Sequence, residues 1–157
     1  MTNFLVVIED NRGSVHRMSK EAIAGAQNLD GNVTALVLGA NAESLAQELS
    51  SVEIDKTLIV NHDMVLTYNS DGYTEVVTKV IQSIDPDVII AGHSYQTRDF
   101  MPRVSARLDI PFISDVTMVN GDNYTKQVLN AKLNCTISSS SEKKILSFQS
   151  ACFSEED

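Results

Sequence analysis

The chain has 157 residues, the length of one ordinary domain, and 43% of them are hydrophobic. Lysine and arginine number 12 against 21 aspartate and glutamate residues, so the net charge is −9 at pH 7. This composition excludes disordered and fibrous proteins, and an acidic chain argues against binding to nucleic acid or to an anionic membrane surface. No apolar run approaches the ~20 residues needed to span a bilayer, so we expect no membrane insertion.

The first apolar run begins within three residues of Met1, and no basic segment precedes it. This pattern is typical of a first strand rather than of a signal or transit peptide. Cys135 and Cys152 make neither a disulfide framework nor a metal site, so we expect two reduced thiols in strands. We therefore expect a bacterial cytoplasm or an equivalent reducing compartment.

Short apolar runs and helical patterns alternate through the first two thirds of the chain. The predicted elements are strands at 4–8, 32–38, 57–60 and 88–91, and helices at 19–29, at 73–84 and from an N-cap at Asn41 through Leu49. The helix at 73–84 has one apolar stripe over three turns and ends before Pro86. Strands and helices that alternate in this way predict a Rossmann-like three-layer α/β/α fold with a mostly parallel sheet.

The pattern changes after Asp115, where strand-like runs are joined by turns. We predict strands at 116–119, 127–137 and 144–149, with a turn at 120–122 and a polar hairpin loop at the serine run 138–141. Antiparallel strands are therefore expected toward the C-terminus. One domain would span 1–153, and the acidic residues 154–157 would form a frayed tail.

Several catalytic and nucleotide-binding motifs are absent from the sequence. There is no P-loop, no G-x-S-x-G, and no G-x-G-x-x-G after the first strand, where residues 10–14 contain one glycine. The three histidines lie in separate segments, so a zinc site is not expected. His93 follows a strand end and could suggest a general base, but nothing near it in sequence would orient the ring.

The segment 86–116 carries the most information. A buried strand ends at Gly92, and a helix follows that carries Val104 and Leu108 inward. Proline is tolerated in the first turn of a helix, so we place Pro102 there and expect Asp99 to be the N-cap. Asp99 could also pair with Arg103 at the i, i+4 spacing.

Arg98, Arg103 and Arg107 place three of the twelve basic residues within ten positions. These arginines could form a solvated helix face, or they could anchor a partner surface or an anion. Asp115 has the same two interpretations, as a loop acid that bonds to local backbone or as a contact residue.

The block resembles the N-terminal domain of the electron-transfer flavoprotein alpha subunit. The family pattern is Ala-Gly, then Arg-Asp-x-x-Pro-Arg-Val-Ala-Ala-x-Leu, then Pro-x-Ile-Ser-Asp. Here the matching residues are 91–92, 98–108 and 111–115. The opening 5–9 and the closing 144–153 also look like that family, so the resemblance covers nearly the whole chain.

The resemblance implies a scaffold domain that docks the beta subunit and supports electron transfer from flavin dehydrogenases to an acceptor. It implies that FAD is held by the C-terminal domain of the alpha subunit, which is absent here, so we expect no cofactor and no catalytic residue in this chain alone. The family's alpha subunit is about twice as long, and the sequence stops where a linker is expected, so a domain boundary of a longer protein is favoured over a short natural protein. The candidate interface or structural residues are Arg98, Asp99, Pro102, Arg103, Arg107, Ser114 and Asp115.

Two other functions remain open from the sequence. A stand-alone adenine-nucleotide-binding module of the universal-stress type shares the architecture and the acidic composition. Such proteins carry a phosphate loop with spaced glycines near the fourth strand, whereas residues 92–97 contain one glycine. A hydrolase of related fold would need a nucleophile paired with a base, and the sequence offers no such pair.

Overall fold

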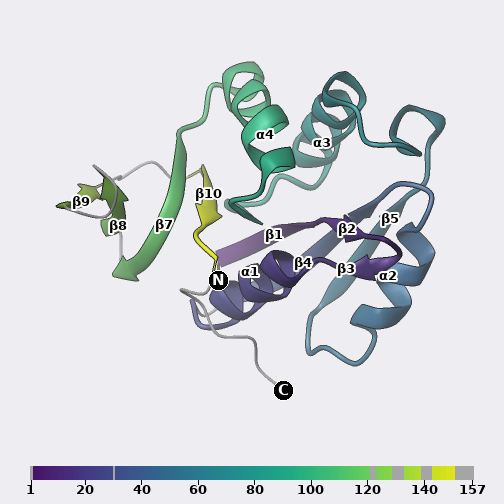
Figure 1. Cartoon of the computed structure of the whole chain (residues 1–157), viewed down its shortest axis with the longest axis horizontal. Coiled ribbons are helices and arrows are strands. Elements are labelled where there is room, and N and C mark those ends of the chain that lie inside the picture. The colour runs from purple at the N-terminus through teal and green to yellow at the C-terminus, as the bar shows by residue number, and fades with distance from the viewer. Residues whose placement is uncertain (1, 30, 121–122, 129–132, 139–142, 151–157) are drawn as a thin grey trace.

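The computed structural model describes residues 2–29, 31–120, 123–128, 133–138 and 143–150 (Figure 1). The helices are α1 (Arg17–Gln27), α2 (Ala42–Leu49), α3 (Ser70–Ile84) and α4 (Tyr95–Leu108), with a short 3-10 turn at Asp63–Val65. The strands are β1 (Thr2–Ile8), β2 (Asp10–Asn11), β3 (Ser14–Val15), β4 (Gly31–Leu38), β5 (Lys56–Val60), β6 (Val88–Gly92), β7 (Phe112–Asn120), β8 (Asn123–Val128), β9 (Leu133–Ser138) and β10 (Lys144–Phe148).

One eight-stranded sheet organises the molecule, in the order β5-β4-β1-β6-β10-β7-β8-β9. The pairs from β5 to β7 are parallel, while β7-β8 and β8-β9 are antiparallel. The predicted α/β fold with a mostly parallel sheet is therefore confirmed. The chain builds outward from β1 to β5 and then returns through α3 to β6, so the order of strands reverses between β1 and β6.

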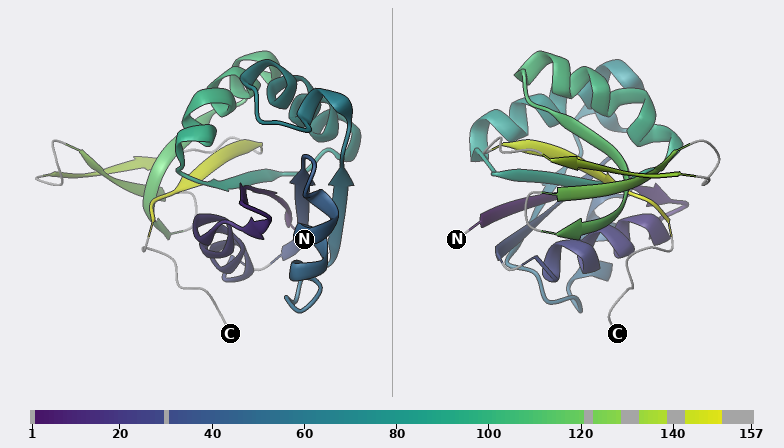
Figure 2. Two further views of the ribbon diagram at one scale, coloured as in Figure 1. Left: turned by 45° about the vertical axis from the view of Figure 1, so that its right-hand side comes forward. Right: turned by 90° about the vertical axis from the view of Figure 1, so that its left-hand side faces the viewer.

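Helices cover both faces of the sheet (Figures 1 and 2). Strand β1 is buried on both sides: Phe4, Val6 and Ile8 pack with α1 and α2, while Leu5 and Val7 pack with α3 and α4. This alternation explains why the run 4–8 is apolar at every position. The antiparallel strands β8 and β9 extend away from the body of the sheet (Figure 2).

The C-terminal prediction needs two corrections. The expected strand at 127–137 is two strands, β8 and β9, which pair with each other. The hairpin expected at the serine run is also wrong, because β10 does not pair with β9 but lies parallel between β6 and β7. The physical reason is burial: Ile145, Leu146 and Phe148 are almost inaccessible, so β10 fills the centre of the sheet rather than its edge. Strands β7 and β8 pair antiparallel on either side of the predicted turn at 120–122, of which residues 121–122 lie outside the described residues.

Helix α4 begins earlier than predicted. Ser94 is its N-cap, so Asp99 lies inside the helix, and Pro102 is its eighth residue rather than part of the first turn. The Ser94 hydroxyl accepts from the Thr97 N–H at 3.2 Å, and this cap starts the helix directly after β6. Pro102 therefore leaves one backbone carbonyl, that of Arg98, without its usual helical donor.

Two local features before α2 also differ from expectation. Residues 10–15 form a small antiparallel hairpin, β2-β3, whose turn places Arg12 and Gly13 at positive φ. Asn41 stands at the N-cap position of α2 but makes no side-chain cap bond, because its amide donates to Asp10 Oδ2 at 2.9 Å.

Some predictions fall outside the described residues. These are the acidic tail at 154–157, Cys152 and most of the serine run. Cys135 lies in β9, as expected of a strand residue. Within the described part of the chain, no helix is long and apolar enough to cross a membrane.

Candidate functional site

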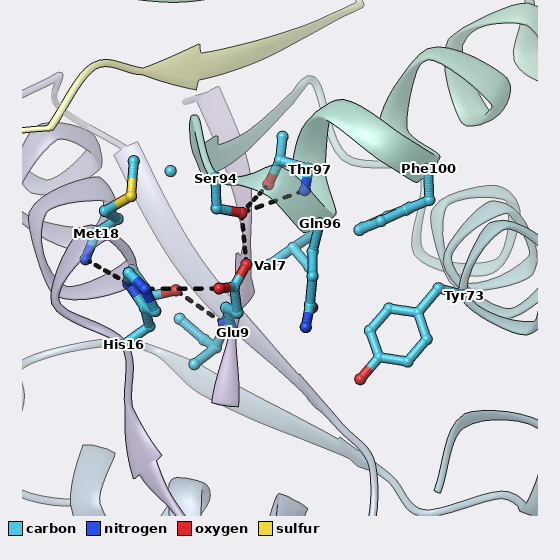
Figure 3. Close-up of a pocket in the computed structure, with 12 residues that line it drawn as sticks. Val7, Glu9, His16, Met18, Tyr73, Ser94, Gln96, Thr97 and Phe100 are labelled. Atoms are coloured by element: carbon cyan, nitrogen blue, oxygen red, sulfur yellow. Dashed lines mark hydrogen bonds and ion pairs between the residues drawn. The ribbon is translucent and has the colours of Figure 1, made fainter. Parts of the chain in front are cut away.

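The reversal of strand order between β1 and β6 creates a crevice at the carboxyl ends of these strands, where open α/β sheets meet their ligands. An open depression of about 540 Å³ lies there. Its lining comes from the end of β1, the start of α1 and the amino end of α4: Glu9, His16, Met18, His93, Ser94, Tyr95, Gln96 and Arg98. Figure 3 shows the adjoining pocket, which shares several lining residues with the depression.

The side chain of Glu9 points to the amino end of α4 (Figure 3). The Ser94 hydroxyl donates to Glu9 Oε1 at 2.5 Å, and His16 Nε2 lies 3.6 Å from Glu9 Oε2. The backbone N–H of Glu9 donates to Ser19 Oγ at 2.8 Å, which fixes the chain as it leaves β1. The protein thus places its own carboxylate where a helix amino end would favour a ligand anion.

The pocket beneath Glu9 is too small for a nucleotide phosphate. It has a volume of about 10 Å³, which is room for about one water molecule. Gly92 also has a packing role here, because a Cβ added to it would lie 2.5 Å from the Cβ of Met18 in α1. The single glycine lets β6 approach α1 and does not open the backbone toward a ligand. This arrangement disfavours the nucleotide-binding alternative.

A second polar cluster joins β6, β7 and β10. The Ser147 hydroxyl is fully buried, lies 2.8 Å from His93 Nδ1, and accepts from the Asp115 N–H at 2.8 Å. Strand β7 has a β-bulge opposite β10, where two residues, Ser114 and Asp115, lie opposite the single residue Ser147. At this bulge Asp115 has a positive φ of 58°. The local interpretation of Asp115, an acid held in a structural bend, is the one that the geometry favours.

His93 is held mainly as the neutral imidazole. Burial lowers its pKa from the ordinary value, the nearby charge of Asp115 opposes this shift, and Arg98 and Lys126 add to it. His93 and Ser147 resemble a base and a nucleophile, but Ser147 has no exposed surface to offer a substrate. The cluster is therefore structural, and the hydrolase alternative gains no support from it.

Two of the three arginines join α4 to α3. Arg103 bonds to Asp71 and to the Ser70 hydroxyl, each at 2.8 Å, and Arg107 bonds to Glu75 at 2.7 Å. The pair predicted between Asp99 and Arg103 is not among the ion pairs of the described residues. The reason is tertiary: α3 offers Arg103 an acid from outside its own helix.

Asp99 instead accepts a hydrogen bond from the Tyr68 hydroxyl at 2.6 Å. Burial and this carboxylate raise the pKa of Tyr68, so the phenol remains protonated and able to donate. Tyr68 also contacts the rings of Tyr73 and Phe100. Asp99 therefore ties α4 to the segment that precedes α3.

Arg98 differs from its two neighbours. Its guanidinium carbon lies 5.7 Å from the centre of the Tyr95 ring, and both side chains are exposed, Tyr95 at 87%. No ion pair involves Arg98 in the part of the chain that the structure describes. Of the predicted residues, Arg98 alone lines the depression, while Ser114 accepts from Lys126 at 3.2 Å beside the bulge.

The bond between Arg107 and Glu75 changes the pKa of Glu75, and this change can be measured. The Arg107 and Lys79 side chains lower the pKa of Glu75 from its ordinary value of 4.5. Because the folded-state pKa is lowered, this stabilisation is present above pH 4.5 and is lost as the pH falls through the folded-state value. We expect Arg107→Ala to raise the Glu75 pKa toward 4.5, measured by NMR of the side-chain carboxyl. An unchanged pKa would contradict the bond, and Arg98→Ala, which leaves the bond intact, is the control.

Comparison with known proteins identifies relatives over most of the chain. The family model of the electron transfer flavoprotein domain matches residues 4–157. The chain belongs to this family. Electron transfer flavoprotein subunit alpha of Bacillus subtilis (strain 168) is 34% identical over 134 residues, which is 82% of this chain and 41% of that protein. The probable mitochondrial alpha subunit of Caenorhabditis elegans is 30% identical over 155 residues, 98% of this chain and 47% of that protein.

Protein FixB of Clostridium saccharobutylicum is also similar, at 29% identity over 142 residues, 84% of this chain and 42% of that protein. The chain thus spans less than half the length of these three relatives. The matches confirm the resemblance to the alpha subunit of electron transfer flavoproteins, and they support a role in electron transfer.

The family name implies a flavin, so we compared the crevice of this electron transfer flavoprotein domain with what a flavin cofactor would need. Glu9 already takes the helix amino end, and the pocket below it admits about one water. The Glu9 carboxylate would repel the pyrophosphate of FAD at this helix end, although the open depression beside it measures about 540 Å³.

Sequence reasoning missed three polar residues that line this crevice. Glu9, His16 and Ser94 are not among the candidate residues that the sequence indicated. A signal existed for Ser94, because a serine two residues after a buried strand, followed by a long helical pattern, is typical of an N-cap. The contact of Ser94 with Glu9 had no sequence signal, since the two residues are 85 positions apart.

Proposed function

We propose that this chain acts as the N-terminal scaffold domain of an electron-transfer flavoprotein alpha subunit. In this role it docks the beta subunit and supports the part of the alpha subunit that holds FAD. The assembled protein would carry electrons from flavin dehydrogenases to an acceptor. The domain itself would supply no catalytic group.

One observation carries the proposal: the family match extends over residues 4–157 but over less than half of each alpha-subunit relative. The polar groups at the crevice are consistent with a scaffold, because Glu9 bonds to Ser94 and lies beside His16, so that its carboxylate already has partners within the domain. The reducing compartment expected from the sequence stays a prediction.

The proposal is tested by co-expression of this chain, carrying an affinity tag, with the electron-transfer flavoprotein beta subunit of the same genome. We expect the two chains to co-purify as a 1:1 complex, measured by size-exclusion chromatography with light scattering. We also expect no flavin absorbance from the chain alone. Separate elution of the two chains, or flavin bound to the isolated chain, would contradict the proposal.

A further inference from the structure

Tyr95 and Arg98 form an exposed pair on the first turns of α4. They lie at the i, i+3 spacing, so they share one face of the helix, and the guanidinium carbon is 5.7 Å from the ring centre. Tyr95 is 87% exposed, the largest exposure among the exposed large hydrophobic side chains of the described residues. Tyrosine and arginine are the residue types that most often anchor protein interfaces.

The other arginines of α4 are already engaged inside the domain. Arg103 pairs with Asp71, and Arg107 pairs with Glu75, so the charge of each is already matched by an acid of α3. Arg98 has no ion pair among the described residues and lines the depression. The three arginines that the sequence grouped together thus divide into two that hold α3 and one that faces outward.

The acidic side chain that lines the depression does not neutralise the charge of Arg98. Glu9, an acid in the lining, bonds to Ser94 and lies beside His16, so its carboxylate is directed inward. The chain has a net charge of −9, and Arg98 shares its state, exposed and without an ion pair among the described residues, with one other arginine, Arg12. A planar guanidinium preferentially binds a carboxylate through two parallel hydrogen bonds.

We propose that Tyr95 and Arg98 anchor a carboxylate-bearing segment of the partner subunit. The aspartate or glutamate of that segment bonds to the Arg98 fork, and an adjacent apolar group packs on the Tyr95 ring beside the depression. This inference rests on the proposed function, because it names the surface through which the beta subunit docks.

The experiment measures binding of the purified beta subunit to four forms of the chain by isothermal titration calorimetry: unaltered, Arg98→Ala, Arg98→Lys and Arg107→Ala. We expect Arg98→Ala to weaken binding roughly 10-fold to 100-fold with an unchanged melting temperature, since central anchors have effects of this size. Arg98→Lys keeps the positive charge but loses the planar guanidinium, so its affinity should lie between that of the unaltered chain and that of Arg98→Ala. Arg107→Ala removes the same charge from the same helix, and we expect it to lower the melting temperature and leave affinity within a few-fold.

Salt dependence provides a second readout. The affinity of the unaltered chain should fall as ionic strength rises, and Arg98→Ala should make this dependence shallower. Equal affinity of Arg98→Ala and the unaltered chain would overturn the inference but leave the proposed function standing. Failure of the unaltered chain to bind the beta subunit would overturn both. Self-association that Arg98→Ala abolishes, measured by light scattering without the beta subunit, would overturn the inference in favour of a second copy as the occupant.

Discussion

Replacing Gly92 with alanine is expected to destabilise the domain by about 2–3 kcal/mol, because overpacking at a closed contact typically has a cost of this order. The added Cβ would lie 2.5 Å from the Cβ of Met18 and 3.0 Å from its carbonyl oxygen. Neither atom is the flexible end of a side chain, so α1 must move away from β6. Urea unfolding monitored by circular dichroism measures the change in the free energy of unfolding.

A double-mutant cycle with Met18→Gly isolates this contact. In the Met18→Gly background the closest clashing atom is gone, so Gly92→Ala should cost clearly less than in the unaltered chain. The contact with the Met18 carbonyl remains, so a part of the cost should persist. The same cost in both backgrounds would show that the packing of β6 against α1 is not the reason for a glycine at this position.

Replacing Ser147 with alanine is expected to lower the free energy of unfolding by roughly 2–3 kcal/mol, because two polar partners lose a buried hydroxyl. Those partners are the Asp115 N–H and His93 Nδ1, both 2.8 Å from Ser147 Oγ. For a domain of this size the melting temperature should fall by roughly 5–10 °C, measured by calorimetry.

Ser114→Ala is the matched control for Ser147→Ala. Ser114 lies at the same bulge, but it is only half-buried and has one longer bond, to Lys126 at 3.2 Å. We expect a change below about 1 kcal/mol, as for a single partly exposed hydrogen bond. Equal effects of the two substitutions would contradict the assignment of Ser147 as the residue that holds the bulge.

Much of the fold could be predicted from the sequence because it depends on local patterns. The apolar run at 4–8 identified a strand buried on both faces, and the stripe at 73–84 identified α3. The start of α4 was misplaced because Pro102 was assigned to a first turn, the position that proline prefers. The cap at Ser94 starts the helix earlier, and its length of 14 residues accommodates the proline.

The candidate site was predictable in part. The sequence singled out the arginines of α4. It could not show which of them form ion pairs within the domain, because their acidic partners lie on α3. Asp71 and Glu75 engage Arg103 and Arg107, and nothing in the sequence indicates that these helices lie side by side. The expected bond of Asp99 with Arg103 failed for the same reason, since Tyr68 approaches Asp99 from another segment.

The sequence by itself determined the α/β class, the order of most elements and the family to which the chain belongs, because periodicity and local motifs are carried by neighbouring residues. Only the tertiary structure decided that β10 enters the middle of the sheet, that Glu9 bonds to the amino end of α4, and that Arg98 has no ion pair among the described residues. Each of these depends on groups far apart in the chain, such as Glu9 and Ser94. Such contacts form only when the sheet brings its strand ends together, and the local pattern of residues carries no record of them.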